Sequence, residues 1–186
     1  MIVRPAEPAD LPTLAPLWRA AWLDGHEGHV PAELMDARGP DHFAVHTEKY
    51  IASTLVAAEA DGRILGLIIL GDDDGEVIQL AVDGSARGKG VGGMLLRSAE
   101  ERFRGRHREA WLAVVPGNTR ARRMYEFHGW RDTGPITYQA PTASGTVDVP
   151  VHRYVKDLTA SDAEAPGPAA GGPEPQSSLR KPESTA

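Results

Sequence analysis

The sequence predicts an α/β (α+β) fold: a mixed, mainly antiparallel sheet of six to seven strands flanked by about four helices, with one parallel pair of strands. Three observations lead to this prediction. Apolar residues recur at helical spacing in several stretches, among them 11–21 and 91–99. Two runs of strand-forming residues flank the turn Asp61-Gly62, which is typical of a β-hairpin. A glycine-rich loop, residues 87–93, then separates a strand from a helix.

The N-terminal part is expected to be mainly helical. Residues 2–5 form a short strand that ends at a proline, and Asp10 has the position of an N-cap for a helix over residues 11 to about 23. A second helical region follows over residues 31 to about 52, with an interruption near Gly39-Pro40. These helices precede the first long strand.

The pattern changes to strands after residue 53. Residues 54–59, 64–70 and 76–82 are rich in aliphatic side chains and are separated by turn residues, which predicts an antiparallel meander. A helix over residues 91–102 and a strand over residues 110–115 follow. Together with the strand before them they form a unit whose crossover should be parallel and right-handed.

The domain is expected to close with a helix over residues 119–128 and two strands, near 136–140 and 149–158. The residues that follow are mainly Pro, Gly, Ser and Ala without periodicity. Such a segment buries too little apolar surface to offset the entropy lost on ordering it. We therefore predict one domain, residues 1–158, and a disordered tail, residues 159–186.

Composition narrows the function classes. The chain has 186 residues, of which 41% are apolar and 25% charged, as in ordinary globular proteins. A net charge of −6 argues against nucleic acid as a partner, because phosphate binding requires positive charge. The longest apolar run is too short to cross a membrane and the N-terminus lacks a signal-peptide pattern, so we expect a cytoplasmic protein. With no cysteine and no recognised ligand pattern among the histidines, no metal site is expected.

The glycine-rich loop is the main candidate binding site. Glycine lets the backbone approach a ligand closely, and a helix N-terminus presents free N–H groups to an anion. The loop lies between a strand and a helix, so a diphosphate is the ligand we expect. Its residues are Arg87, Gly88, Lys89, Gly90, Val91, Gly92 and Gly93.

Other interpretations of this loop are weaker. Gly88, Gly90 and Gly93 match the G-x-G-x-x-G pattern of dinucleotide-binding proteins, but the next strand ends in Val115-Pro116 and lacks the acidic residue that binds a ribose. The Gly-Lys-Ser/Thr ending of a triphosphate-binding loop is also absent. A glycine-rich turn without a ligand is the remaining alternative.

The loop and two further segments resemble the GNAT superfamily of N-acetyltransferases. The pyrophosphate loop of that family has the form R/Q-x-x-G-x-G/A, and Arg87, Gly90 and Gly92 fill these places. Residues 118–130 resemble the family segment N-x-x-A-x-x-x-Y-E-x-x-G-F, with Trp130 in the usual Phe place. The similarity covers roughly residues 1–158.

The resemblance implies that acetyl-CoA is the co-substrate and enters a gap where two strands of the sheet splay apart. It also implies that the backbone of the strand before the loop pairs with the pantetheine amides. The residues that the resemblance assigns to the cofactor are Leu80, Ala81, Val82, Arg87, Gly88, Lys89, Gly90, Val91, Gly92, Gly93 and Asn118. Asn118 could also cap the helix that follows it.

The resemblance further implies two catalytic residues. Tyr125 matches the general acid of the family, and a phenol can donate a proton to a departing thiolate. Glu76 matches the carboxylate that is the base in some members; a water chain is the alternative. The loop that carries Trp22, His26 and His29 usually borders the acceptor pocket in this fold.

We therefore predict an acyl-CoA-dependent N-acyltransferase that transfers an acetyl group by direct attack of a primary amine of a small molecule or peptide. An acyl-CoA-binding regulatory or interaction module without turnover is the main alternative, and a nicotinamide-dependent oxidoreductase is more distant. Related proteins often pair through sheet edges or C-terminal strands, which suggests a homodimer.

Overall fold

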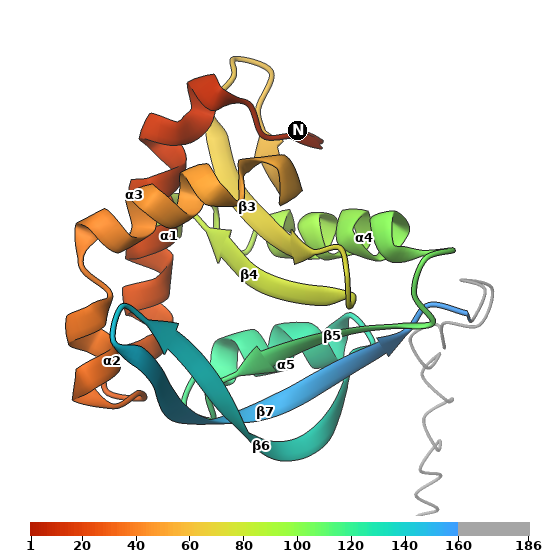
Figure 1. Ribbon diagram of the computed structural model, residues 1–186. Coiled ribbons are helices and arrows are strands. Elements are labelled where there is room, and N and C mark those ends of the chain that lie inside the picture. The colour runs from red at the N-terminus through yellow and green to blue at the C-terminus, as the bar shows by residue number, and fades with distance from the viewer. Residues whose placement is uncertain (160–186) are drawn as a thin grey trace, which may run out of the picture.

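The computed structural model describes residues 1–159, which form a seven-stranded sheet in the order β1-β2-β3-β4-β5-β7-β6 (Figure 1). Every neighbouring pair of strands is antiparallel except β4 and β5, which are parallel. The strands are β1 (Ile2–Pro5), β2 (Thr54–Ala58), β3 (Ile64–Gly71), β4 (Glu76–Val82), β5 (Glu109–Val114), β6 (Arg131–Thr142) and β7 (Gly145–Asp157). The predicted fold class is confirmed.

Five α-helices accompany the sheet in this part of the chain because the second predicted helical region is divided at Gly39. They are α1 (Leu11–His26), α2 (Ala32–Ala37), α3 (Pro40–Lys49), α4 (Val91–Phe103) and α5 (Thr119–Phe127). Short 3-10 helices span Pro8–Asp10, Ile51–Ser53 and Gly84–Ala86. None of the helices described is long and apolar enough to cross a membrane.

Asp10 precedes α1 as predicted, but its side chain does not cap the helix. Its carboxylate instead accepts two hydrogen bonds from the Arg4 guanidinium, at 2.7 and 2.9 Å, and one from the backbone N–H of Glu7 at 2.8 Å. A paired guanidinium favours the ionised carboxylate and lowers the pKa of Asp10. The contact therefore ties β1 to the start of α1.

The C-terminal hairpin is longer than predicted. β6 contains Pro135 and Pro141, which interrupt the strand pattern in the sequence. As the edge strand of the sheet β6 needs only one set of backbone hydrogen bonds, and its register with β7 shifts between Asp132 and Pro135. Pro150 of β7 lies beyond the residues that pair with β5, so its missing N–H leaves no gap there. The predicted disordered tail lies, apart from Thr159, outside the described residues.

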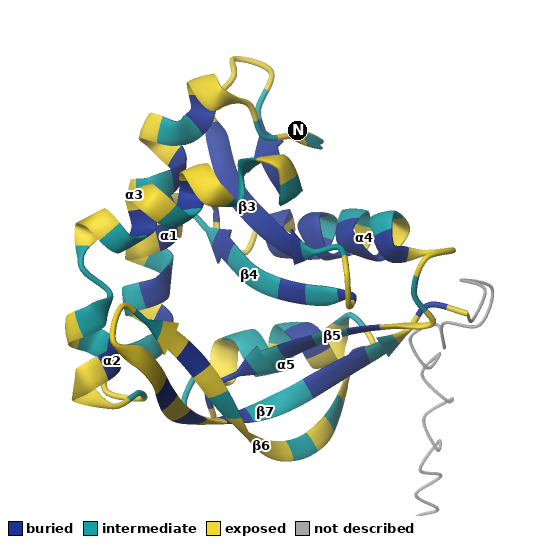
Figure 2. Cartoon of the chain, in the orientation of Figure 1, coloured by how far each residue is buried: buried dark blue, intermediate teal, exposed yellow. Residues whose placement is uncertain are grey.

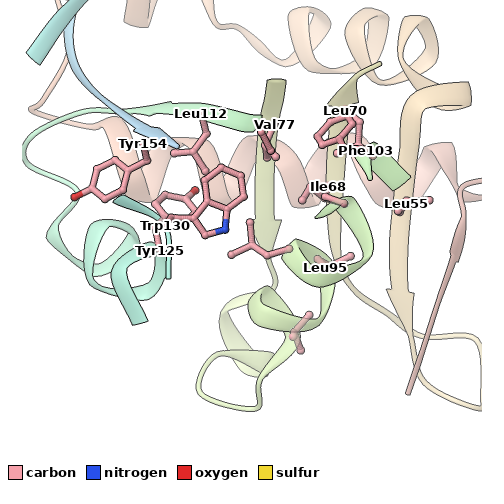
Figure 3. Packing of buried hydrophobic residues seen from close by; sticks show 14 of the residues in the cluster. Leu55, Ile68, Leu70, Val77, Leu95, Phe103, Leu112, Tyr125, Trp130 and Tyr154 are labelled. Atoms are coloured by element: carbon pink, nitrogen blue, oxygen red, sulfur yellow. The ribbon is translucent and has the colours of Figure 1, made fainter. Parts of the chain in front are cut away.

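Helices cover the two faces of the sheet and enclose two apolar cores. Helices α4 and α5 pack on one face, with Leu95, Phe103 and Tyr125 buried against strand residues; Figure 3 shows Tyr125, Trp130 and Tyr154 gathered beside Leu112 in this core. Helices α1, α2 and α3 pack on the other face. The central strand β3 is buried along almost its whole length, whereas β6 is largely exposed (Figure 2).

Candidate active site

The sheet opens between β4 and β5. Their register contains one pair of residues, Glu76 and Trp111, next to a hydrogen bond from the Trp111 N–H to the Gly75 carbonyl of 3.0 Å. Beyond this point the two strands diverge toward α1 and α2 (Figure 1). The edge of β4 over residues 77–82 therefore has no neighbour in β5, although its other edge is paired with β3.

A β-bulge alters the direction of the side chains along β4. Val77 pairs with Leu70 and Gln79 with Ile69, so Ile78 is the extra residue. Before the bulge, Val77 faces the core beneath α4; after it, Leu80 faces that core and Ala81 faces the core beneath α1. Of the three predicted cofactor residues on β4, Leu80 and Val82 line a cavity at the opening, and Ala81 is buried on the opposite face.

The glycine loop combines two kinds of glycine. Gly88 and Gly90 have φ values of 73° and 79°, in the left-handed region that glycine adopts without strain. Gly90 precedes α4 and provides no side-chain cap, so the first N–H groups of the helix stay available to an anion. A Cβ at Gly93 would lie 2.3 Å from the His128 ring, and one at Gly92 would lie 2.8 Å from Met124 Sδ. These two glycines allow α4 to approach α5 closely.

The first cavity of the site lies between this loop and α5 and has a volume of about 270 Å³. Seven of the predicted cofactor residues line it, whereas Lys89, Gly90 and Gly93 lie in the loop or helix but outside the lining. The free edge of β4, the left-handed loop and the helix N-terminus fit a pantetheine arm and a pyrophosphate. The seven residues are Leu80, Val82, Arg87, Gly88, Val91, Gly92 and Asn118.

Arg120 is a lining residue that sequence reasoning missed. Asp24, near the end of α1, contacts both Arg120 and Arg87, the latter at 3.1 Å. These contacts, with Arg120 the stronger, lower the pKa of Asp24. The contact between α1 and α5 joins residues distant in the sequence, and Arg120 is one of several arginines on α5, so no sequence pattern distinguished it.

A second cavity, of about 220 Å³, lies on the α1 side of the opening. Trp22 and His26, two of the three residues expected beside an acceptor pocket, line this cavity. His29 instead packs against Gly117, where a Cβ would lie 2.1 Å from the His29 ring. Sequence reasoning did not anticipate the residues contributed by α3, β6 and the end of α2. These include Arg38, His42, His46 and Tyr138.

The two cavities meet at Tyr125. Tyr125 is buried, with 8% of the residue exposed, and its hydroxyl forms no hydrogen bond with any residue in 1–159. Burial raises the pKa of Tyr125, so the phenol holds its proton at neutral pH. Asn118 also lines both cavities, and its Oδ1 accepts a hydrogen bond of 3.1 Å from the Ala121 N–H and so caps α5. The residues common to both linings are Ala21, Leu80, Asn118, Ala121 and Tyr125.

Glu76 lines the second cavity. Burial raises its pKa to about 7, and the negative charge of Asp74 acts in the same direction. The hydroxyl of Tyr138 donates a hydrogen bond of 3.4 Å to Glu76 Oε1, which opposes the rise. Glu76 can therefore exchange a proton near neutral pH, as a general base requires.

Comparison with solved structures places the fold among acetyltransferases. A GCN5-related N-acetyltransferase from Kribbella flavida is 26% identical, with a TM-score of 0.63 over 84% of this chain and 96% of that one. A putative acetyltransferase from Salmonella typhimurium, yncA, solved with its cofactor acetyl-CoA, is 19% identical, with a TM-score of 0.63 over 90% and 99%. A spermidine N-acetyltransferase chimera from Vibrio cholerae and hSSAT is 19% identical, with a TM-score of 0.56 over 85% and 96%.

No curated protein matches the sequence significantly. A family model does: the acetyltransferase (GNAT) family matches residues 14–130, which include β4, the glycine loop and all of α5. This range holds every residue that the resemblance assigned to the cofactor and to catalysis. Acetyl-CoA is accordingly the co-substrate, and the chain belongs to the GNAT family of acetyltransferases.

Proposed function

We propose that the protein is an N-acetyltransferase that transfers the acetyl group of acetyl-CoA to a primary amine of a small molecule or peptide. The observation that carries this proposal is the junction of two cavities at Tyr125, one beside the glycine loop and one containing Glu76. A donor and an acceptor can each occupy one cavity and meet at the junction. Direct attack then needs no covalent enzyme intermediate.

The first cavity would hold acetyl-CoA, whose thioester supplies an activated acyl group. Arg87 and the N–H groups at the start of α4 provide positive charge and donors for the pyrophosphate. The unpaired edge of β4 near Leu80 and Val82 provides backbone groups for the pantetheine amides. Asn118 bounds both cavities and holds the start of α5, which carries Tyr125.

The acceptor nitrogen attacks the acyl carbon, so a C–N bond forms and the C–S bond breaks. Glu76 Oε accepts the proton that the amine loses, directly or through water. Tyr125 Oη holds a proton because burial disfavours its phenolate, and it donates that proton to the leaving sulfur. The two residues have pKa values shifted in the directions that these roles require.

Calorimetric titration with acetyl-CoA, followed by CoA-release assays on a panel of amines, tests the proposal. We expect micromolar binding, loss of binding in Gly90→Glu, and turnover with at least one class of amine. Any side chain at Gly90 is strained, because its φ is 79°. Gly39→Ala is the control for replacing a glycine elsewhere, because Gly39 has no positive φ and no atom near its Cβ. Binding without turnover on every amine and peptide pool would favour an acyl-CoA-binding module instead.

A further inference from the structure

Arg38 is a positively charged residue in the wall of the second cavity. It follows the last residue of α2 and is half-buried, and it forms no ion pair with any carboxylate in residues 1–159. Its Nη1 donates a hydrogen bond of 3.5 Å to His42 Nδ1. By contrast, Arg87 and Arg120 of the first cavity both contact Asp24. A guanidinium without a counter-charge is unusual in a partly buried wall.

The groups around Arg38 do not neutralise it. Burial and then the charge of Arg38 lower the pKa of His42 to about 4, and burial with a smaller effect of Arg38 lowers the pKa of His26. Both rings are therefore neutral at pH 7. The His26 Nδ1–H donates to the Trp22 carbonyl at 2.8 Å, which leaves Nε2 as an acceptor. Tyr138 is close enough to interact with the charge of Arg38, but its phenol is protonated because burial raises its pKa to about 12.

Glu76 belongs to the same cavity but is not the counter-ion. Its hydrogen-bond partner is Tyr138, and its charge is opposed by burial and by Asp74. A paired guanidinium would lower the pKa of a carboxyl group, whereas the pKa of Glu76 is raised. The cavity therefore has a proton acceptor at one place and an uncompensated cation at another.

We infer that the acceptor is an amine that also carries an oxyanion, a carboxylate or a phosphate, and that Arg38 binds this group while the amine faces Glu76. The inference rests on the proposed function, which it deepens by naming the acceptor class. Guanidinium groups bind both oxyanions through paired N–H donors. Trp22 and Phe43 line the same cavity and provide apolar walls for the part of the acceptor between the two charges. A polyamine would place a second cation near Arg38 and should be a poor acceptor.

Matched acceptors test the inference on the unaltered protein. Amino acids with an increasing number of carbons between amine and carboxylate are compared with their amides, and O-phosphoethanolamine with ethanolamine. We expect kcat/KM to be about 10- to 100-fold higher for at least one anionic member than for its neutral partner, as a charge-assisted hydrogen bond supplies. The spacer length of the best amino acid reports the distance between the sites that bind its amine and its carboxylate. Comparing the amino acids with O-phosphoethanolamine distinguishes a carboxylate from a phosphate.

Variants assign the preference to one residue. In Arg38→Gln the ratio between anionic and neutral acceptors should fall to within about threefold. The affinity for acetyl-CoA should stay near its original value, because Arg38 does not line the first cavity. Arg38→Lys, which keeps the charge, should retain part of the preference. Arg19→Gln, at an exposed arginine of α1 outside both cavities, is the matched control and should keep the full ratio.

Two results would overturn the inference in different ways. Equal turnover of anionic and neutral acceptors, or an unchanged preference in Arg38→Gln, would contradict it and leave the acetyltransferase proposal intact. Acetyl-CoA binding with CoA release at background for every acceptor would overturn the proposed function and the inference together.

Discussion

Tyr138 of the edge strand β6 donates a hydrogen bond of 3.4 Å to Oε1 of Glu76 on β4. The contact links the C-terminal hairpin to the point where β4 and β5 begin to separate. It also sets the position of the carboxylate proposed as the base. Because burial outweighs this hydrogen bond, the pKa of Glu76 lies near 7.

Replacing Glu76 by glutamine should lower kcat/KM by about 100-fold, because a general base contributes on that order. In the original protein, activity should rise as pH increases through about 7 while Glu76 loses its proton. This part of the pH profile should vanish in Glu76→Gln, with the same acceptor in both assays. Glu101→Gln, at an exposed position of α4, is the control. An unchanged profile would assign the base to a water chain.

The same residue should make stability depend on pH. The pKa of Glu76 is about 4.5 in an unfolded chain and about 7 in the folded one, so the folded state favours the protonated form. The contribution of Glu76 to stability is therefore greatest below pH 4.5 and is lost as pH rises through 7. The free energy of unfolding of Glu76→Gln relative to the original protein should grow by about 1–2 kcal/mol between pH 5 and 8. Urea unfolding at both pH values measures it; a constant difference would contradict the burial of this charge.

Tyr125→Phe should lower kcat by about 100-fold and leave acetyl-CoA affinity within a few fold. The ring keeps its contacts with Trp130 and Tyr154, at centroid distances of 6.3 and 5.9 Å, and the lost hydroxyl makes no hydrogen bond in the described chain. Tyr154→Phe provides the contrast, because its hydroxyl donates to Glu126 and accepts from Arg122. We expect it to lose about 1 kcal/mol of stability while kcat is unaffected. Full activity in Tyr125→Phe would remove the phenol from the chemistry.

Gly93→Ala should destabilise the fold by about 1–3 kcal/mol, since the added methyl would lie 2.3 Å from the His128 ring. Thermal unfolding of Gly93→Ala, His128→Ala and the double variant shows how much of the loss comes from the clash with the His128 ring. Adding Gly93→Ala to His128→Ala should cost much less stability than adding it to the original protein, because the ring that the methyl would meet is absent. Additive losses would show that Gly93 is required for another reason.

Much of the fold was predictable because its signals are local. The strands of the meander and the helices around the glycine loop follow from apolar periodicity and turn residues, and their bounds differ little from those predicted. The length of the β6–β7 hairpin was underestimated because its prolines weaken the strand pattern in the sequence. Whether a strand tolerates a proline depends on which of its residues pair with a neighbouring strand. Sequence alone does not contain that position.

The site was predictable only in part, for the same reason. The glycine loop and the segment around Tyr125 are contiguous motifs, so the sequence alone makes them candidate site residues. Asp24 meets Arg120, and Tyr138 meets Glu76, across 96 and 62 positions of the chain, so these contacts depend on packing. Glycines in the same loop are also required for different reasons that the sequence does not distinguish. Gly88 has a positive φ, whereas Gly93 makes room for the His128 side chain at the end of α5.

The separation of β4 from β5 after a single pair has a consequence for the exchange of amide hydrogens. Amides on the open edge of β4 should exchange with deuterium quickly in the free protein, although they belong to a central strand, whereas amides directed toward β3 should exchange slowly. A bound pantetheine arm would occupy that edge as an additional strand does. Mass spectrometry of deuterated peptides from residues 77–82 would then detect the donor as protection of backbone positions, before any acetyl group is transferred.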